Sequence, residues 1–522
     1  MLKNIYQLHR RLSIIIAIPV LLWAISGFMH PIMTNIRPAI ATQGIPPVTV
    51  DSARLRFPLT EALRRHHMDS LANVRLVHID TNWFYQVQPV GRDVPIYLSC
   101  TNGNMLTAGD WLYAQYLARQ FLEGPAQSVA HNHINPVAHF ASTTTSAHDC
   151  CGAATETVLN PTKGAKVSNV SMVRAYNKEY KSINRLLPVY CVSFERADGI
   201  RIYVETTQDR FSFAMDNRRA LFDDIFRLCH TWGWLDFLGR GRLAIEVLVA
   251  LTALLTTILG IYIFFTTKAS KATGNKLVKA RRNHRYTAIV ASLFTLMWTF
   301  SGSFHAFSKF SGDPHDQRRE PDHFAAAATD LDWARLSAAC PRPVTNISLV
   351  QIGGVTYWRA ALLPEHVAAH KDLMKDPKTA LTPTAYIRTT DYIILADGDA
   401  HYAQTLADAY SGHKPEDILS TTPVTSFNDE YNFTDKRLPV WKISYAANAH
   451  ERLYIETATG KLASRMNDRS VVEGYSFALL HKHHFMDWGG KSVRDASTMF
   501  WVFLQVVMVS FGLVLWFRRK IR

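Results

Sequence analysis

The sequence lacks the short motifs that mark most enzyme classes. Its 522 residues contain no H-E-x-x-H, no G-x-S-x-G, no Walker A loop and no G-x-G-x-x-G. Acidic residues are few, 43 against 57 lysines and arginines, and cysteine occurs six times. The missing motifs exclude a recognisable nucleotide or flavin site. The mean hydropathy of −0.05 is too high for a disordered chain and too low for a fully embedded transporter.

Four long apolar runs stand out from this average. A helix needs about 20 apolar residues to cross the hydrocarbon core of a bilayer. Short basic flanks stay in the cytoplasm, and here they occupy residues 3–11, 268–285 and 518–522. We therefore expect both termini inside, and we attribute part of the net charge of +14 to topology and none of it to nucleic-acid binding. The four runs are Leu12–Met33, Leu243–Phe265, Tyr286–Phe307 and Ala496–Phe517.

The two halves of the chain repeat each other. At an offset of 275, His9-Arg10, Trp23, Ser26-Gly27 and His30 recur as His284-Arg285, Trp298, Ser301-Gly302 and His305. At an offset of 251, Pro188, Tyr203, Glu205-Thr206, His230 and Asp236 recur as Pro439, Tyr454, Glu456-Thr457, His481 and Asp487. We expect a tandem duplication whose two parallel units are related by a pseudo-two-fold axis along the membrane normal.

The expected parts follow in order along the chain. They are a cytoplasmic N-terminus with the first membrane helix (1–33), a large outer domain (34–242), a second helix (243–265), a basic cytoplasmic loop (266–285), a third helix (286–307), a second outer domain (308–495), and a fourth helix with a basic C-terminus (496–522).

The two outer segments have an α+β pattern. A helix at 59–66 precedes strands at 74–79 and 83–87, and a helix at 332–339 precedes strands at 347–352 and 355–361. Each segment later carries Y-[IV]-E-T, at Tyr203–Thr206 and Tyr454–Thr457. Such helix-then-hairpin modules resemble PepSY domains. With the H-R…S-G and L-x-H segments, the whole chain resembles the PepSY-associated transmembrane-helix family, which implies a four-helix membrane bundle with α+β periplasmic PepSY-like domains.

That resemblance also implies a location and an activity. Some members of the family are iron-regulated inner-membrane proteins, and one branch comprises haem-bearing ferric-siderophore reductases. The resemblance therefore implies a multi-pass protein of the bacterial inner membrane, with its large domains in the periplasm and electron transfer to a ferric chelate.

Three histidines recur in register in both halves. Imidazole is the usual protein ligand of b-type haem iron, and ionisable residues at membrane depth are usually functional. We expect His9 to face His284 on the inner side and His30 to face His305 on the outer side, with His230 and His481 as a third pair. Such pairs can hold two b haems, which are non-covalent because no C-x-x-C-H occurs. Location among the lipid headgroups, or at a helix cap, is the alternative.

The spacing of these histidines raises an objection to electron transfer. His9 and His30 are 21 residues apart, or about 31 Å along a helix. Haems so far apart would exchange electrons slowly. His230 and His481 shorten the distance only if they dip into the bilayer and replace His30 and His305.

Two other repeated features have simpler interpretations. The Trp and Ser-Gly positions favour close helix packing. Asp236 and Asp487 would either cap a helix or hold His230 and His481 through a hydrogen bond.

An insertion of 38 residues, between about 124 and 185, distinguishes the first half. It contains Cys150-Cys151 and His131, His133, His139 and His148. The histidines suggest a metal site, because imidazole and thiolate suit copper, zinc and iron. The adjacent cysteines are a candidate redox pair, or alternatively a structural disulfide. Cys100, Cys191, Cys229 and Cys340 allow several further pairings.

Two functions are consistent with the sequence. The first is a haem-b transmembrane oxidoreductase that passes electrons from quinol or a cytoplasmic reductase to a periplasmic small-molecule acceptor such as a ferric chelate. The second is a non-catalytic, membrane-anchored PepSY protein that binds a ligand or regulates a partner.

Overall fold

The computed structural model describes residues 2–124, 165–269, 275–311, 319–364, 383–428 and 430–520. The chain forms two compact units. The helical unit comprises residues 1–37, 218–313 and 467–522, and the sheet unit comprises residues 38–217 and 314–466. The boundaries differ from the expected ones, because residues 218–242 and 467–495 belong with the long helices and not with the outer domains.

All four expected apolar helices are present. They are α1 (Leu2–Asn35), α5 (Arg240–Thr266), α6 (Lys276–Ser308) and α12 (Gly490–Lys520), and each is long and apolar enough to cross a membrane. The helices are longer than the apolar runs because their basic flanks are also helical. Helix α6 begins ten residues before Tyr286, where the side chain of Asn275 accepts a hydrogen bond from Leu277 N at 2.8 Å. The expected loop at 266–285 therefore includes the first turns of α6.

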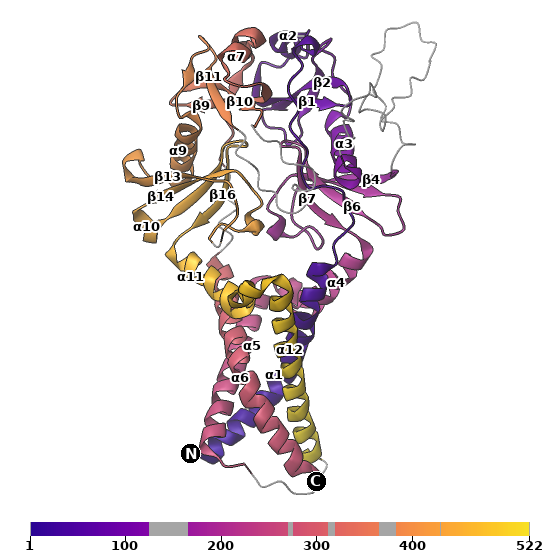
Figure 1. Cartoon of the computed structure of the whole chain (residues 1–522), viewed down its shortest axis with the longest axis vertical. Helices are drawn as coiled ribbons and strands as arrows, with labels where there is room; N and C mark the ends of the chain where they lie inside the picture. The colour runs from indigo at the N-terminus through magenta and orange to yellow at the C-terminus, as the bar shows by residue number, and fades with distance from the viewer. Residues whose placement is uncertain are drawn as a thin grey trace. The chain divides into compact units, whose positions relative to one another are not determined.

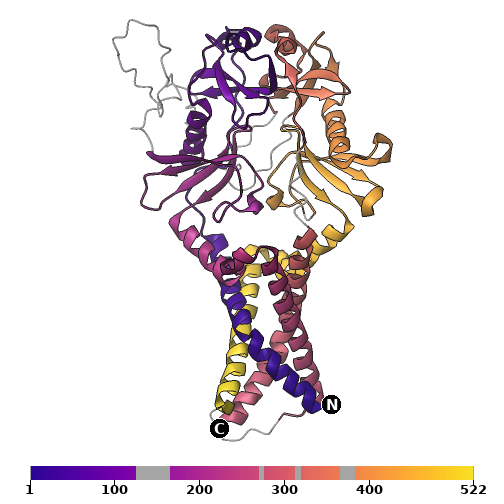
Figure 2. The same ribbon diagram turned by 180° about the vertical axis from the view of Figure 1, so that it is seen from behind.

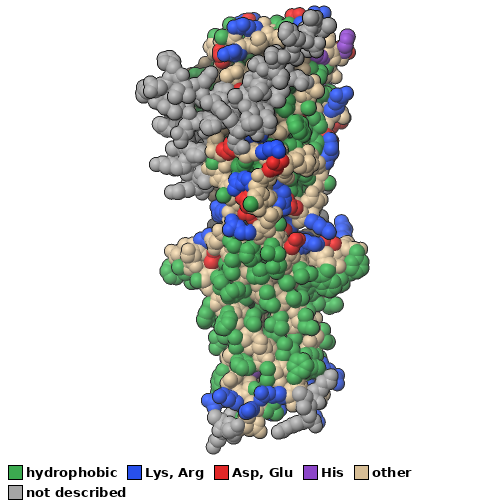
Figure 3. Space-filling model, turned by 90° about the vertical axis from the view of Figure 1, so that its right-hand side faces the viewer, with side chains coloured by type: hydrophobic (Ala, Val, Ile, Leu, Met, Phe, Trp, Pro, Cys, Tyr) green, Lys and Arg blue, Asp and Glu red, His purple; other side chains and the backbone are tan. Residues whose placement is uncertain are grey.

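The four long helices lie side by side. Helix α1 packs against α5 and α12, and α6 packs against the same two helices (Figures 1 and 2). Both chain termini lie at one end of these helices (Figure 1). Figure 3 shows apolar side chains along their outer surface and basic side chains at that end. Ile18 and Leu248, for example, are 67% and 65% exposed. Such a surface suits contact with lipid.

Short helical segments complete the helical unit. Helix α4 (Asn217–Cys229) and the turn Gly233–Leu238 precede α5, and α11 (Asp468–Ser476) and the turns Phe477–His481 and His484–Gly489 precede α12. Asp236 accepts from Arg242 and Arg227 at 2.9 and 3.2 Å. Asp487 accepts from Arg494 at 2.7 Å. These carboxylates therefore hold the turns to adjacent helices, Asp236 to α4 and α5 and Asp487 to α12, rather than orienting His230 and His481.

Within its described residues, the sheet unit contains four antiparallel sheets of four strands each. Their orders are β3-β2-β1-β8, β4-β5-β6-β7, β12-β11-β10-β9 and β13-β14-β15-β16. The strands of the first two are β1 (Ser70–Ile79), β2 (Asn82–Pro89), β3 (Ile96–Ser99), β8 (Phe324–Ala325), β4 (Val167–Val173), β5 (Val189–Phe194), β6 (Arg201–Glu205) and β7 (Arg210–Met215). Those of the other two are β9 (Val344–Ile352), β10 (Val355–Leu362), β11 (Thr384–Arg388), β12 (Ile394–Leu395), β13 (Ile418–Val424), β14 (Val440–Tyr445), β15 (Arg452–Glu456) and β16 (Lys461–Met466).

Helices fill the space between the sheets of each half. Helix α3 (Gly109–Glu123) buries Leu117 and Phe121 in a core shared by sheets β1–β3 and β4–β7. Helix α9 (Gly398–Ser411) does the same in the second half with Tyr402 and Leu406. Helices α2 (Leu59–Arg65) and α7 (Trp333–Ala339) contribute to a third core. The expected helix-then-hairpin order is confirmed at both places.

The two halves of the sheet unit join through paired asparagines. Strands β1 and β9 lie next to each other. The side chain of Asn73 accepts from Leu349 N at 3.1 Å, and that of Asn346 accepts from Leu76 N at 3.0 Å. Each asparagine side chain thus accepts a hydrogen bond from a backbone N–H of the other half.

A buried charge cluster, formed by Glu205, Glu456, Arg210, Arg437 and Lys461, makes a second connection. Arg210 and Arg437 each donate to Glu456 at 2.5 Å. Glu205 lies 3.5 Å from Arg210 and 3.7 Å from Lys461. Both glutamates are 1% exposed. The glutamates of the two Y-[IV]-E-T motifs therefore hold the halves together.

Candidate functional site

The six repeated histidines all lie in the helical unit. Helix α1 carries His9 and His30, and α6 carries His284 and His305. His230 directly follows α4, and His481 ends the turn that follows α11.

His9 and His284 are held in the same way. His9 Nδ1 lies 3.0 Å from the carbonyl oxygen of Thr256 on α5, and His284 Nδ1 lies 3.1 Å from that of Met508 on α12. A carbonyl oxygen only accepts, so each Nδ1 carries the hydrogen. The lone pair of each ring is therefore on Nε2, the state in which imidazole binds a metal ion.

Glycines make room for these two rings. A Cβ on Gly260 would lie 3.1 Å from His9 Cε1, and one on Gly512 would lie 3.4 Å from His284 Cε1. Each glycine follows the accepting carbonyl by four residues, which is one helical turn. The glycine and the carbonyl together form a seat for the imidazole. Gly260 and Gly512 are 252 residues apart, whereas the repeated positions before them, such as His230 and His481, are 251 residues apart. This shift of one residue concealed their correspondence in the sequence.

Serines hold His230 and His481. Ser26 Oγ donates to its own helix at 2.9 Å and lies 3.0 Å from His230 Nδ1. Ser301 Oγ donates to Met297 O at 2.7 Å and lies 3.2 Å from His481 Nδ1. Because the hydroxyl hydrogen is used within the helix, the serine oxygen accepts from Nδ1. These rings too keep the lone pair on Nε2. The Ser-Gly motif therefore orients histidines in addition to allowing close packing.

His230 and His481 face each other across the helical unit. Their ring centroids are 6.2 Å apart and their planes are nearly perpendicular, at 86°. An imidazole nitrogen binds a transition metal at about 2.0–2.1 Å and lies roughly 1.1 Å from its ring centroid. Two imidazoles on opposite sides of one metal ion therefore have centroids about 6.3 Å apart. The observed separation fits this arrangement.

A phenylalanine lies between each of these rings and a further histidine, His30 or His305. Phe226 stacks on His230 and contacts His30, with ring centroids 4.5 and 5.6 Å away. Phe477 stacks on His481 and on His305 at 4.7 and 4.2 Å. The rings in contact are therefore those of His230 and His481, whereas His30 and His305 each contact a phenylalanine. His305 Nδ1 also pairs with Glu473 at 2.6 Å, and this carboxylate was not anticipated from the sequence.

Two side chains of helix α1 fix the position of His230. Trp23 Nε1 donates to His230 O at 3.0 Å, and Ser26 holds the ring. His230 thus lies near Ser26, which is 17 residues from His9, or about 26 Å along the helix. This separation is shorter than the 31 Å estimated for His9 and His30.

The second half has a histidine, His483, at a position where the first half has a tryptophan. Trp232 stacks on Trp23 with centroids 5.1 Å apart, and His483 stacks on Trp298 at 5.5 Å in the corresponding place. His483 is fully buried, and its Nε2 has no hydrogen-bond partner among the described residues. The repeat in the sequence did not reveal this residue, because the corresponding position in the first half is Trp232.

The proposed metal and redox residues of the insertion cannot be placed. Cys150, Cys151, His131, His133, His139 and His148 lie outside the described residues. Within the described ranges, no group of three or more histidine, cysteine or acidic side chains could hold a metal ion. Cys100, Cys191, Cys229 and Cys340 are free thiols. None of the pairings considered for these four cysteines is present.

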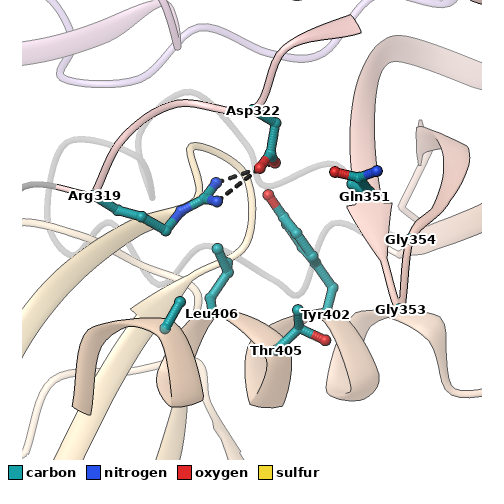
Figure 4. A pocket seen from close by; sticks show the side chains of 9 residues that line it. Arg319, Asp322, Gln351, Gly353, Gly354, Tyr402, Thr405 and Leu406 are labelled. Atoms are coloured by element: carbon teal, nitrogen blue, oxygen red, sulfur yellow. Dashed lines mark hydrogen bonds and ion pairs between the residues drawn. The ribbon is translucent and has the colours of Figure 1, made fainter. Parts of the chain in front are cut away.

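The sheet unit contains a cavity of about 250 Å³ beside α9 (Figure 4). Arg319 donates to both oxygens of Asp322, at 2.7 and 3.0 Å, and Tyr402 and Gln351 point toward the same space. Because the carboxylate of Asp322 neutralises the guanidinium of Arg319, this cavity offers little net charge to a ligand.

Comparison with known protein families agrees with the presence of membrane helices. The family model described as PepSY-associated TM region matches residues 6–339. The chain belongs to the PepSY-associated TM family. No curated protein matches the sequence. Membership in this family, with four apolar helices, makes the chain a multi-pass membrane protein.

Proposed function

We propose that this member of the PepSY-associated TM family is a haem-b transmembrane oxidoreductase. The observation that carries the proposal is the state of four histidines. His9, His284, His230 and His481 are each anchored through Nδ1 and keep Nε2 for a metal. A histidine that only satisfies a helix end has no need of this repeated orientation.

The chemistry of the donor set fits haem. Two neutral imidazoles per iron are the ligands expected for a b-type haem, and hydrogen bonds to Nδ1 fix the ring and increase its basicity. The glycines beside His9 and His284 and the 6.2 Å separation of His230 and His481 also fit. Bound haem would supply one-electron chemistry through its ferric and ferrous states. The protein's own part is to hold the two ligand pairs about 26 Å apart along α1.

The proposed topology places the protein in the bacterial inner membrane. Basic residues at the termini and at the start of α6 would lie in the cytoplasm, with His9 and His284 on the inner side. The sheet unit would then be periplasmic. We further propose that the chain is a tandem duplication forming a four-helix bundle around a pseudo-two-fold axis along the membrane normal, because both halves repeat the same contacts to histidine.

The acceptor and donor follow from this topology. A periplasmic small molecule such as a ferric chelate would receive the electrons. Quinol in the bilayer or a cytoplasmic reductase would supply them.

A second candidate function needs no haem. The sheet unit contains two cavities of about 250 and 240 Å³. A membrane-anchored binding or regulatory protein would use such cavities and would leave the histidines structural.

Absorption spectroscopy separates the two functions. Protein purified from haem-sufficient cells is measured as isolated in air and again after dithionite. The oxidoreductase predicts a Soret band that shifts on reduction and a sharp α-band. Protein without a Soret band would favour the binding function.

A further inference from the structure

The second cavity, of about 240 Å³, lies where the two halves of the sheet unit meet. Residues of β1, β2, α3, β9 and β10 line it. Its walls include His78, Trp83, Tyr113 and Tyr116, so aromatic rings line part of the side formed by the first half. Ligand pockets usually measure about 300–1,000 Å³, so this cavity would admit only a small ligand.

One of its two arginines is already satisfied. Arg75 donates to Asp209 at 2.8 Å and also reaches Gln86 Oε1 and Thr206 O at 3.2 and 3.3 Å. Tyr113 donates to the same Asp209 at 2.6 Å. Arg75 and Asp209 therefore form a neutral, buried part of the wall.

The other arginine is available. Arg359 donates from Nε to Tyr386 at 3.2 Å, and its side chain lies 3.9 Å from Asp399. Its two terminal nitrogens have no hydrogen bond within the described part of the chain. A planar guanidinium whose edge of two terminal nitrogens is free is suited to a carboxylate.

Ser348 is the second polar group. It is the cross-strand partner of Arg359, so the two side chains project from the same face of the sheet. Ser348 is 5% exposed, and its Oγ has no hydrogen-bond partner among the described residues. A buried hydroxyl without a partner is costly, and a ligand in the cavity would satisfy it.

We propose that this cavity binds a small aromatic carboxylate. Its carboxylate pairs with Arg359 and accepts from Ser348 Oγ, and its ring packs against the aromatic wall of Trp83 and Tyr113. Burial lowers the pKa of His78, which leaves that ring neutral at pH 7 and the guanidinium as the cation that selects the charge. This inference concerns the sheet unit alone and does not depend on haem.

Calorimetric titration of the full-length protein in detergent tests the proposal, with benzoate as the probe. We expect benzoate to bind, and its neutral analogue benzamide and the ringless acetate to bind at least tenfold more weakly, because each lacks one of the two recognised features. The absence of binding at millimolar benzoate, or equal affinity for benzamide, would overturn the proposal.

Two variants and one control locate the site. Arg359→Gln is expected to weaken benzoate binding at least tenfold, and Ser348→Ala severalfold. Arg388→Gln, on the neighbouring strand, removes an arginine that pairs with Asp391 outside the cavity, and it should change nothing. If Arg359→Gln does not fold, Ser348→Ala alone decides the matter. Wild-type affinity in Ser348→Ala, or equal loss in Arg388→Gln, would contradict the assignment.

Discussion

Single hydroxyl groups decide the tautomer of two histidines. Ser26 and Ser301 are part of a repeated Ser-Gly motif whose sequence indicates only close packing. Each serine uses its hydrogen within its own helix and accepts from an imidazole of another segment. The type of residue was visible in the sequence, but its partner was not, because 204 positions separate Ser26 from His230.

Removal of the hydrogen bond between Ser26 and His230 should weaken haem binding, although His230 itself remains in place. We predict that Ser26→Ala lowers haem affinity at the His230–His481 pair by about 10- to 100-fold, the usual cost of losing a hydrogen bond to a ligand. Haem transfer to apomyoglobin measures this affinity. Ser13→Ala is the matched control, since Ser13 Oγ donates to His9 O within the same helix at 2.7 Å. Equal haem loss in both variants would assign Ser26 a general structural role.

Substitution of His230 and substitution of His30 should have different effects on haem content. His230→Ala is expected to remove about half of the haem absorbance per chain, because it deletes one ligand of a pair. His30→Ala should retain it, since His30 contacts Phe226 and not the opposite histidine. Spectra of the two purified variants provide the comparison. Loss of haem in His30→Ala alone would restore the pairing of His30 with His305.

Helical elements supply the seats for the inner pair. Gly260 on α5 and Gly512 on α12 lie one turn beyond the carbonyls that accept from His9 and His284. The sequence predicted the four helices and both histidines, because apolar length and repetition are local signals. It did not predict the glycine seats, because they depend on which helices are neighbours.

Graded substitution of the glycines tests these seats. A Cβ would lie 3.1 Å from His9 at Gly260 and 3.4 Å from His284 at Gly512, and it would meet nothing within 4 Å at Gly474. We therefore predict that Gly260→Ala impairs haem retention most, Gly512→Ala less, and Gly474→Ala not at all. The measurement is the ratio of Soret to protein absorbance after purification. An effect of Gly474→Ala as large as that of Gly260→Ala would exclude a steric cause.

At the scale of the whole molecule, the two halves of the sheet unit share a buried charge cluster. Burial alone would raise the pKa of Glu456, but Arg210 and Arg437 hold it well below its ordinary value of 4.5. Burial likewise opposes the ionisation of Glu205, and Arg437 and Arg210 lower its pKa. Sequence repetition marked both glutamates as motif residues, but their contact with arginines of both halves arises only in the folded chain.

Removal of one member of this charge cluster should lower the free energy of unfolding. Arg437→Gln leaves a buried carboxylate with one fewer partner, and we predict a loss of about 3–5 kcal/mol in the free energy of unfolding. Lys166→Gln, which breaks an exposed pair with Glu195, should cost about 0–1 kcal/mol. Pulse proteolysis of the full-length protein in urea measures both. Similar losses for the two variants would contradict a special role for the cluster.

The same cluster predicts sensitivity to acid. The pKa values of Glu205 and Glu456 are lower in the folded than in the unfolded chain, so their contribution to stability is complete above pH 4.5 and declines as the pH falls through the folded values. Asp80 and Asp435 act in the opposite sense, because burial raises both pKa values to about 6. The difference in stability between wild type and Glu456→Gln isolates the cluster, and it should shrink below pH 4.5. A difference independent of pH would contradict this assignment.

The central claim is that two pairs of imidazoles hold two haems in the helical unit. The haem-to-protein ratio, obtained from the pyridine haemochromogen spectrum and amino-acid analysis of protein purified from haem-sufficient cells, tests it most directly. We predict a ratio close to two for the wild type and close to one for His230→Ala. A wild-type ratio of zero would contradict the assignment of haem, and an unchanged ratio in His230→Ala would contradict the outer pair.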